Sequence, residues 1–234
     1  IWDLPSQIRN RYLKYCFSHS IRCYMSPKIS DIILLGTDRI HLFDTPLLMC
    51  RNQGLSMEQR AAKRVLDIIV SGLGIIVSSP IMLIIAIAVK AYDGGPVFYL
   101  QDRLTYQGKE FRIRKFRSMC VDSEKNGARL ASKHDSRITP VGHVLRNLHL
   151  DELPQLFNVF MGDMSLVGPR PERDVIMQEY EQEIPEFPDR LKIKAGLTGY
   201  AQVYGKYNTT PYDKLKLDLF YIENYSFLLD IKLL

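Results

Sequence analysis

The pattern of hydrophobic and polar positions divides the chain into three stretches. Residues 1–57 hold short apolar runs, which predict a buried strand at 31–36 and further strand at 41–49. We interpret this stretch as the end of an α/β domain whose beginning is missing, followed by a linker. Residues 58–92 are strongly apolar. Residues 93–234 mix apolar and polar positions in the way that a globular domain does.

The apolar stretch contains a single charged residue, Asp67, between positions 65 and 89. A helix of this length would cross the hydrocarbon core of a bilayer. However, Ser79 and Pro80 lie in its middle, and proline kinks a helix. Basic residues also flank both ends, so the positive-inside rule gives no direction. We therefore expect a re-entrant membrane hairpin, broken at Ser79 and Pro80. A buried core helix and a kinked transmembrane span are the alternatives.

The globular stretch is predicted to mix strands and helices. Strands are expected at 97–100 and 111–119, and helices at 173–184 and 211–225. In the last of these, Leu215, Leu219 and Ile222 share one face, and Asp218 lies off it. Such a helix either rests on a membrane surface or packs into a protein core, and the pattern alone does not choose.

An adjacent acid pair, Asp151 and Glu152, stands at the head of another helical pattern. Apolar side chains recur at helical spacing from 153 to 160, and Gly162 ends the run. One interpretation is that Asp151 caps a helix and Glu152 interacts with its dipole. The other is chemical, because a positioned carboxylate can act as a nucleophile or as a magnesium ligand. Adjacent helical residues diverge by about 100°, so we expect distinct roles.

Basic residues suited to phosphate occur on both sides of the acid pair. The predicted strand at 111–119 carries Lys115 and Arg117, which could bind phosphate oxygens, lie on a solvated face or touch lipid headgroups. Arg170 stands between two prolines that restrict its backbone. That restriction makes it a good anion anchor, although pairing with Glu172 or with another surface acid would also explain it.

The composition indicates which cellular compartment and which class of partner to expect. The chain has 234 residues, with 46% hydrophobic and 24% charged, and a net charge of +5 that suits an anionic partner. The cysteines form no CxxC pair, so neither a disulfide framework nor a zinc site is expected, and a reducing compartment is the default. No nucleic-acid-binding motif is present, and we expect no nucleic-acid partner.

Several segments together resemble one family. They are the apolar stretch broken at Ser79 and Pro80, KFRSM (115–119), LDELPQLFNVFMGDMSLVGPRP (150–171), GLTGYAQVYG (196–205) and FLLDIK (227–232). Their order and spacing resemble the bacterial sugar transferases of the monotopic polyprenyl-phosphate phosphoglycosyl transferase type. The resemblance runs from about residue 58 to the end of the chain, and residues 1–57 look like the end of the nucleotide-binding-like domain of longer members.

The resemblance implies an α/β fold, a mixed α+β catalytic domain at 93–234, with a re-entrant membrane helix hairpin at 58–92 and interfacial amphipathic helices. It implies transfer of a sugar 1-phosphate from a UDP-sugar to undecaprenyl phosphate, with release of UMP, on the cytoplasmic face of the bacterial inner membrane. Asp151 would attack the substrate, and Asp151 and Glu152 would hold Mg²⁺. Lys115 and Arg170 match the family's basic strand residue and its GPRP arginine, and they would bind phosphate. Arg117 and Arg146 belong to the same basic cluster, which suits two anionic substrates, and are candidate phosphate-binding residues as well.

The chain departs from the family pattern in the glycine-rich segment. Ala195 stands where a proline is common, Tyr200 where many members have tryptophan, and Lys206 where others have arginine. We attribute these changes to packing and to sugar choice. A noncatalytic, membrane-associated scaffold with a basic surface is the alternative function. The sugar, the glycan pathway and self-association into a homo-oligomer are left open.

Overall fold

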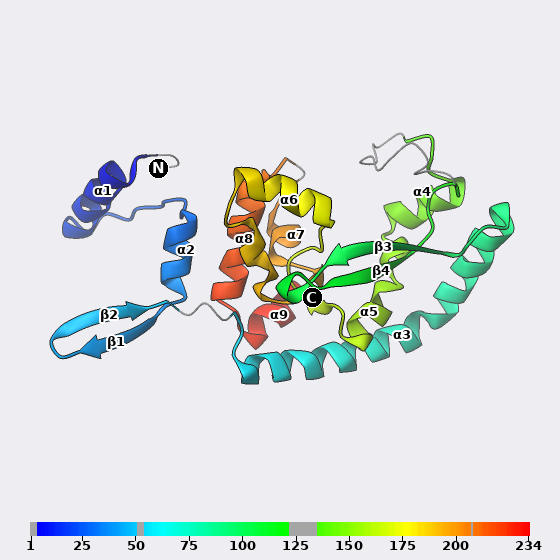
Figure 1. Ribbon diagram of the computed structural model, residues 1–234, viewed down its shortest axis with the longest axis horizontal. Coiled ribbons are helices and arrows are strands. Elements are labelled where there is room, and N and C mark those ends of the chain that lie inside the picture. The colour runs from blue at the N-terminus through cyan, green and yellow to red at the C-terminus, as the bar shows by residue number, and fades with distance from the viewer. Residues whose placement is uncertain (1–3, 51–53, 122–134, 207) are drawn as a thin grey trace. The chain divides into compact units, whose positions relative to one another are not determined.

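The computed structural model describes residues 4–50, 54–121, 135–206 and 208–234. The chain forms two compact units, which divide between Arg51 and Asn52 and are described separately below. The first is small. The second contains the long apolar helix together with all of the candidate site residues. Helices and strands are mixed in both units (Figure 1), as the sequence predicted.

The first unit contains α1 (Ser6–Ser18), α2 (Ile29–Leu35) and an antiparallel hairpin of β1 (Asp38–Leu42) and β2 (Thr45–Met49). The predicted strand at 41–49 is thus part of a hairpin. The predicted strand at 31–36 is wrong, because these residues belong to α2. Asp31 explains the helix: its carboxylate accepts the backbone N–H of Lys28 at 2.8 Å and pairs with Arg9 at 2.5 Å. A short apolar run cannot show such contacts.

The second unit begins with α3 (Met57–Asp93), which is helical over its whole length. Ser56 caps its start together with Gln59, and Gly94, with a φ of 70°, ends it. Pro80 cannot donate a hydrogen bond to the carbonyl of Ile76, but the hydroxyl of Ser79 donates to that oxygen at 2.8 Å. The helix therefore bends without breaking (Figure 1).

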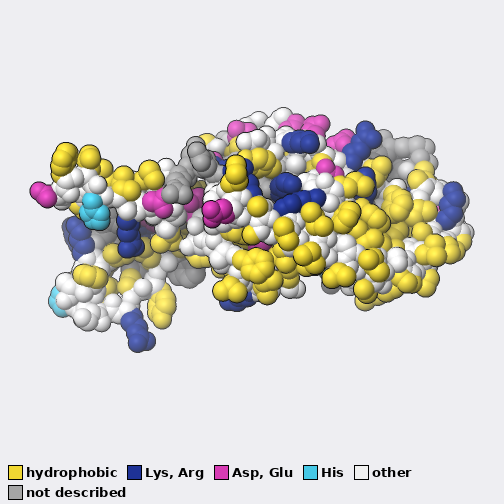
Figure 2. Space-filling view, turned by 90° about the horizontal axis from the view of Figure 1, so that it is seen from below, with side chains coloured by type: hydrophobic (Ala, Val, Ile, Leu, Met, Phe, Trp, Pro, Cys, Tyr) yellow, Lys and Arg dark blue, Asp and Glu magenta, His cyan; other side chains and the backbone are white. Residues whose placement is uncertain are grey.

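Most of α3 is exposed. It is long and apolar enough to cross a membrane, and only 17% of its most apolar stretch is buried inside the protein. Figure 2 shows hydrophobic side chains gathered on this side of the molecule; on α3 they include Leu73, Ile76, Val77, Leu83, Ile84 and Ile87. A soluble protein rarely leaves such a surface uncovered, so this face is suited to lipid. That exposure is evidence against the buried core helix.

The inner side of α3 packs on the rest of the unit. It contacts α4 (Pro140–Asn147), α5 (Gln155–Met161), α9 (Phe227–Leu233), β4 (Glu110–Phe116) and β5 (Ser165–Val167). Near Pro80 the core is formed by Met82, Ile85, Val89, Phe116 and Leu145. Two small sheets complete the frame: β3 (Phe98–Leu104) pairs antiparallel with β4, and β5 pairs parallel with β6 (Gly196–Thr198).

Buried polar contacts fix the first half of α3. Lys63 Nζ lies 2.6 Å from Asp230 Oδ2, and both side chains are almost fully buried. One turn later, Asp67 Oδ1 accepts hydrogen bonds from Ser165 Oγ at 3.0 Å and from the Leu166 N–H at 2.9 Å. The single acidic residue of the apolar stretch therefore holds β5 in place.

The remaining elements of the second unit are three helices and two 3₁₀ turns. They are α6 (Asp174–Glu183), α7 (Tyr200–Tyr204), α8 (Pro211–Glu223), η1 (Tyr106–Gly108) and η3 (Phe187–Lys192). The predicted helices at 173–184 and 211–225 are confirmed as α6 and α8. The apolar face of α8, formed by Leu215, Leu219 and Ile222, is buried in the protein, so the core-packing alternative is the right one. Asp218 is also buried, because it pairs with Arg190 at 2.7 Å.

Candidate functional site

The acid pair sits in a sharp turn between α4 and α5. His149 has a φ of 55°, in the left-handed region that non-glycine residues rarely adopt, and the 3₁₀ turn η2 (Leu150–Glu152) follows it directly. The backbone N–H of Glu152 donates to the carbonyl of His149 at 3.2 Å. The strained residue thus orients Asp151 and Glu152 toward the edge of β4 rather than along a regular helix.

The capping interpretation of Asp151 is wrong. The α-helix starts four residues later, at Gln155, and its N-cap position is occupied by Pro154, which forms no side-chain cap. Proline has no N–H, so regular helical bonding can begin only beyond it. Gly162 ends the helix in the left-handed conformation, with a φ of 95°, as the sequence predicted.

Glu152 is the centre of the charged contacts at the site. Its Oε1 lies 2.6 Å from Lys115 Nζ, which comes from β4, and 3.1 Å from Arg170 Nη2, which follows β5. Burial acts to raise the pKa of Glu152, but Lys115 and Arg170 together hold that pKa below its ordinary value. Glu152 is therefore ionised at neutral pH and fixes both cations. Arg170 therefore does pair with an acid, which is Glu152 and not Glu172.

Asp151 differs from Glu152 both in its contacts and in the direction of its pKa shift. Among the described residues, no side chain forms a hydrogen bond or ion pair with its carboxylate, which is only partly exposed. Burial raises the pKa of Asp151 above its ordinary value, and the charge of Lys115 opposes this effect. Burial is thus a stronger influence on this carboxyl than the nearby positive charge. The two acids thus have different environments, as distinct roles require.

The other two candidate arginines, Arg146 and Arg117, have different partners, and only Arg146 lies beside the acid pair. Arg146, on α4, donates from Nε to Ser118 Oγ at 2.8 Å, and its charge acts to lower the pKa of Asp151, which places it beside the acid pair. Arg117 is buried and donates from Nη1 to Asp93 Oδ2 at 2.8 Å, at the end of α3. It therefore secures the junction between α3 and β3 in this structure.

A small cavity adjoins the cations of the site. It has a volume of about 20 Å³, and its lining includes Lys115, Arg170, Arg103, Gln155, Gly196 and Leu197. The glycine-rich segment therefore reaches the site through β6. Arg103 and Gln155 were missed by the sequence analysis. No local pattern marks either residue, because Gln155 stands among apolar neighbours and Arg103 within a strand.

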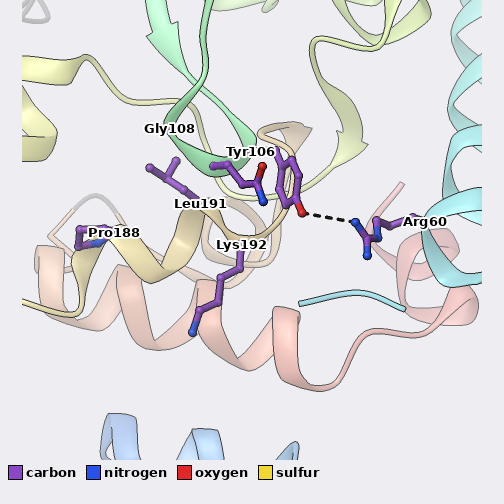
Figure 3. A pocket seen from close by; sticks show the side chains of 7 residues that line it. Arg60, Tyr106, Gly108, Pro188, Leu191 and Lys192 are labelled. Atoms are coloured by element: carbon purple, nitrogen blue, oxygen red, sulfur yellow. Dashed lines mark hydrogen bonds between the residues drawn. The ribbon is translucent and has the colours of Figure 1, made fainter. Parts of the chain in front are cut away.

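A second cavity is much larger but lies elsewhere. Its volume is about 600 Å³, and it opens between Arg60, Tyr106 and Lys192, with Pro188 and Leu191 on its wall (Figure 3). Arg60 donates to the Tyr106 hydroxyl at 3.4 Å across its edge (Figure 3). None of the predicted site residues lines it. The volume of a cavity alone therefore does not identify the candidate site in this protein.

The described carboxylates suit a magnesium site that is shared with substrate. Among the described residues, no three His, Cys, Asp or Glu side chains converge. Mg²⁺ is commonly bound by one or two protein carboxylates together with substrate phosphates. Asp151 fits that arrangement because its carboxylate is unpaired, whereas one oxygen of Glu152 already accepts from Lys115 and Arg170.

Comparisons with known proteins agree on one family. A family model described as bacterial sugar transferase matches residues 58–234. The chain is 43% identical over 224 residues to the UDP-N-acetylgalactosamine-undecaprenyl-phosphate N-acetylgalactosaminephosphotransferase of Aeromonas hydrophila, covering 94% of this chain and 52% of that protein. It is 42% identical over 204 residues to the UDP-glucose:undecaprenyl-phosphate glucose-1-phosphate transferase of Klebsiella pneumoniae, covering 85% of this chain and 42% of that protein. The chain thus spans about half the length of these relatives.

Proposed function

The chain belongs to the bacterial sugar transferase family, and we propose that it transfers a sugar 1-phosphate from a UDP-sugar to undecaprenyl phosphate and releases UMP. The printed names of the relatives support this reaction. The site supports it independently, because both substrates are anions and the acid pair lies among cations. This reaction would start the assembly of an exopolysaccharide, capsule, O-antigen or glycoprotein glycan.

The observation that carries the mechanism is the contrast between the two acids. Asp151 has no partner among the described residues and is partly exposed, so its carboxylate oxygen attacks the β-phosphorus of the UDP-sugar. A bond forms between that oxygen and phosphorus, the bond from phosphorus to the bridging oxygen breaks, and UMP leaves with the electron pair. An oxygen of undecaprenyl phosphate then attacks the same phosphorus and releases Asp151. The covalent phosphosugar intermediate lets one site serve two bulky anions in turn.

The cations hold the phosphoryl groups during both steps. Lys115 and Arg170 are fixed by Glu152, so they are positioned before substrate arrives. Their charges neutralise the phosphoryl oxygens as the bonds change, and Arg146 adds charge on the Asp151 side. Arg117 is omitted from this set because Asp93 holds it.

Mg²⁺ is the proposed cofactor. Asp151 would hold it together with substrate phosphates, and Glu152 would contribute its remaining oxygen. When bound, the ion supplies positive charge to the diphosphate and makes UMP a better leaving group.

The membrane arrangement is proposed from α3. A curved helix with Ser79 and Pro80 in its interior and basic residues at both ends fits a re-entrant segment on the cytoplasmic face of the inner membrane. Such a segment would keep the site beside the phosphate of the lipid substrate. Cysteines placed at Glu58 and at Lys90 and labelled from one side of the membrane test this. Labelling from opposite sides would show a transmembrane span instead.

The reaction itself is tested by measuring UMP release from UDP-N-acetylgalactosamine and UDP-glucose in detergent. Release is expected only when undecaprenyl phosphate and Mg²⁺ are present. Mass spectrometry of protein incubated with the UDP-sugar alone should find a phosphosugar adduct on the peptide that contains Asp151. Lipid binding without any turnover would instead support the noncatalytic scaffold.

A further inference from the structure

Gln155 is a buried amide with an unused donor. It opens α5, only 3% of its surface is exposed, and its Nε2 has no hydrogen-bond partner among the described residues. Leaving such a donor unpaired destabilises the folded protein, so native proteins rarely keep one without a reason.

The same helix shows what a structural amide looks like. Asn158, three residues later, is fully buried, and both ends of its side chain are used. Its Oδ1 accepts the Arg114 N–H at 3.0 Å, and its Nδ2 donates to the Arg112 carbonyl at 2.8 Å. These bonds tie α5 to β4. Gln155 forms no comparable link, so holding the helix against the strand does not explain it.

The surroundings of Gln155 indicate what would satisfy it. It lines the cavity of about 20 Å³ that also borders Lys115, Arg103 and Arg170. Arg103 contributes a second unpaired, buried donor, its Nε. A volume of this size accepts about one oxygen atom or water molecule. Donors and positive charges around such a space favour an oxygen that carries negative charge.

We propose that the side-chain amide of Gln155 donates a hydrogen bond to a phosphoryl oxygen of the substrate and is therefore a substrate-binding residue. The inference rests on the proposed function. The phosphoryl group belongs either to the UDP-sugar or to undecaprenyl phosphate, which share this chemistry. The same cavity borders Lys115 and Arg170, which pair with Glu152, so the amide would hold the phosphoryl group beside the acid pair.

The test uses Gln155→Met, which keeps the length of the side chain and removes the donor, and Asn158→Leu as the matched control. Thermal unfolding of each ligand-free variant is measured in detergent. We expect Gln155→Met to keep or raise the melting temperature, because an unpaired donor is removed, and Asn158→Leu to lower it. A fall for Gln155→Met as large as that of the control would overturn the proposal.

Binding is then measured with two probes, UDP by calorimetry and undecaprenyl phosphate by competition in detergent micelles. We expect Gln155→Met to weaken one of them by about tenfold or more, the effect of losing a hydrogen bond to a charged group. The probe that is weakened identifies the phosphoryl group. Unchanged affinity for both probes overturns the inference. If instead the unmodified protein binds neither probe and releases no UMP, the proposed function itself fails.

Discussion

Two clusters of acids and cations in the second unit differ in how fully their charges are paired. At the base of α3, the Asp230 carboxylate accepts from Lys63 at 2.6 Å and from the Tyr221 hydroxyl at 2.5 Å, with all three side chains buried. At the other cluster, Glu152 is paired, whereas Asp151 has no partner in the part of the chain that the structure describes. The saturated cluster can only hold the structure together. The unsaturated one keeps a carboxylate available for chemistry.

The largest effect is expected for Asp151→Asn. Removing the nucleophile should reduce UMP release at least about a thousandfold, as loss of a covalent catalyst does. The melting temperature should stay the same or rise, because burial disfavours the charge that is removed. Asp102→Asn, at an exposed acid on β3, is the control and should change neither quantity. Full turnover by Asp151→Asn would show that the nucleophile is another group.

The saturated cluster should give the reverse result. Asp230→Asn leaves Lys63 as a buried, unpaired cation, which costs about 3–5 kcal/mol of unfolding free energy. The measurement is denaturant or thermal unfolding in detergent. Arg112→Gln, which breaks the exposed pair with Asp102, is the control and should change the melting temperature little. An Asp230→Asn variant as stable as the parent would show that the two clusters do not differ in this way.

The sequence predicted the elements better than the contacts. The apolar run around Pro80, the end of α5 at Gly162 and the helix at α8 all follow from local patterns. The contacts of Glu152 do not, because Lys115 is 37 positions away and Arg170 is 18. The family resemblance proposed these residues as a set, and only the fold shows that they meet.

The errors have a common physical cause, which is that polarity along a chain does not reveal a partner. Asp218 lies off the apolar face of α8 but is buried, because Arg190 neutralises it. Arg117 lies next to the end of β4, where it resembles Lys115, but it follows the strand and reaches Asp93 instead. Gln155 sits among apolar neighbours and gives no sign of its unpaired donor.

A smaller effect is expected for Arg170. Half of its side chain is exposed and its bond to Glu152 is 3.1 Å long, so solvent screens part of its charge. Arg170→Gln should weaken binding of UDP by about tenfold without lowering the melting temperature. Arg170→Lys should recover only part of the affinity, because it keeps the charge but loses the planar fork. If Arg170→Gln binds UDP normally, the role of Arg170 is limited to its contact with Glu152.

The smallest effect, and the most specific, concerns pH. Asp151 acts as an anion, so activity should fall as the pH drops through its pKa, which burial has raised above the ordinary value for aspartate. Lys115 opposes that rise, so Lys115→Met should raise the pKa of Asp151 further and move the acid limb of kcat/KM to higher pH. Arg112→Gln removes an exposed cation from the same strand and should leave the limb in place. An acid limb unmoved by Lys115→Met would mean that a group other than Asp151 sets it, and the unsaturated cluster would then not be the source of the nucleophile.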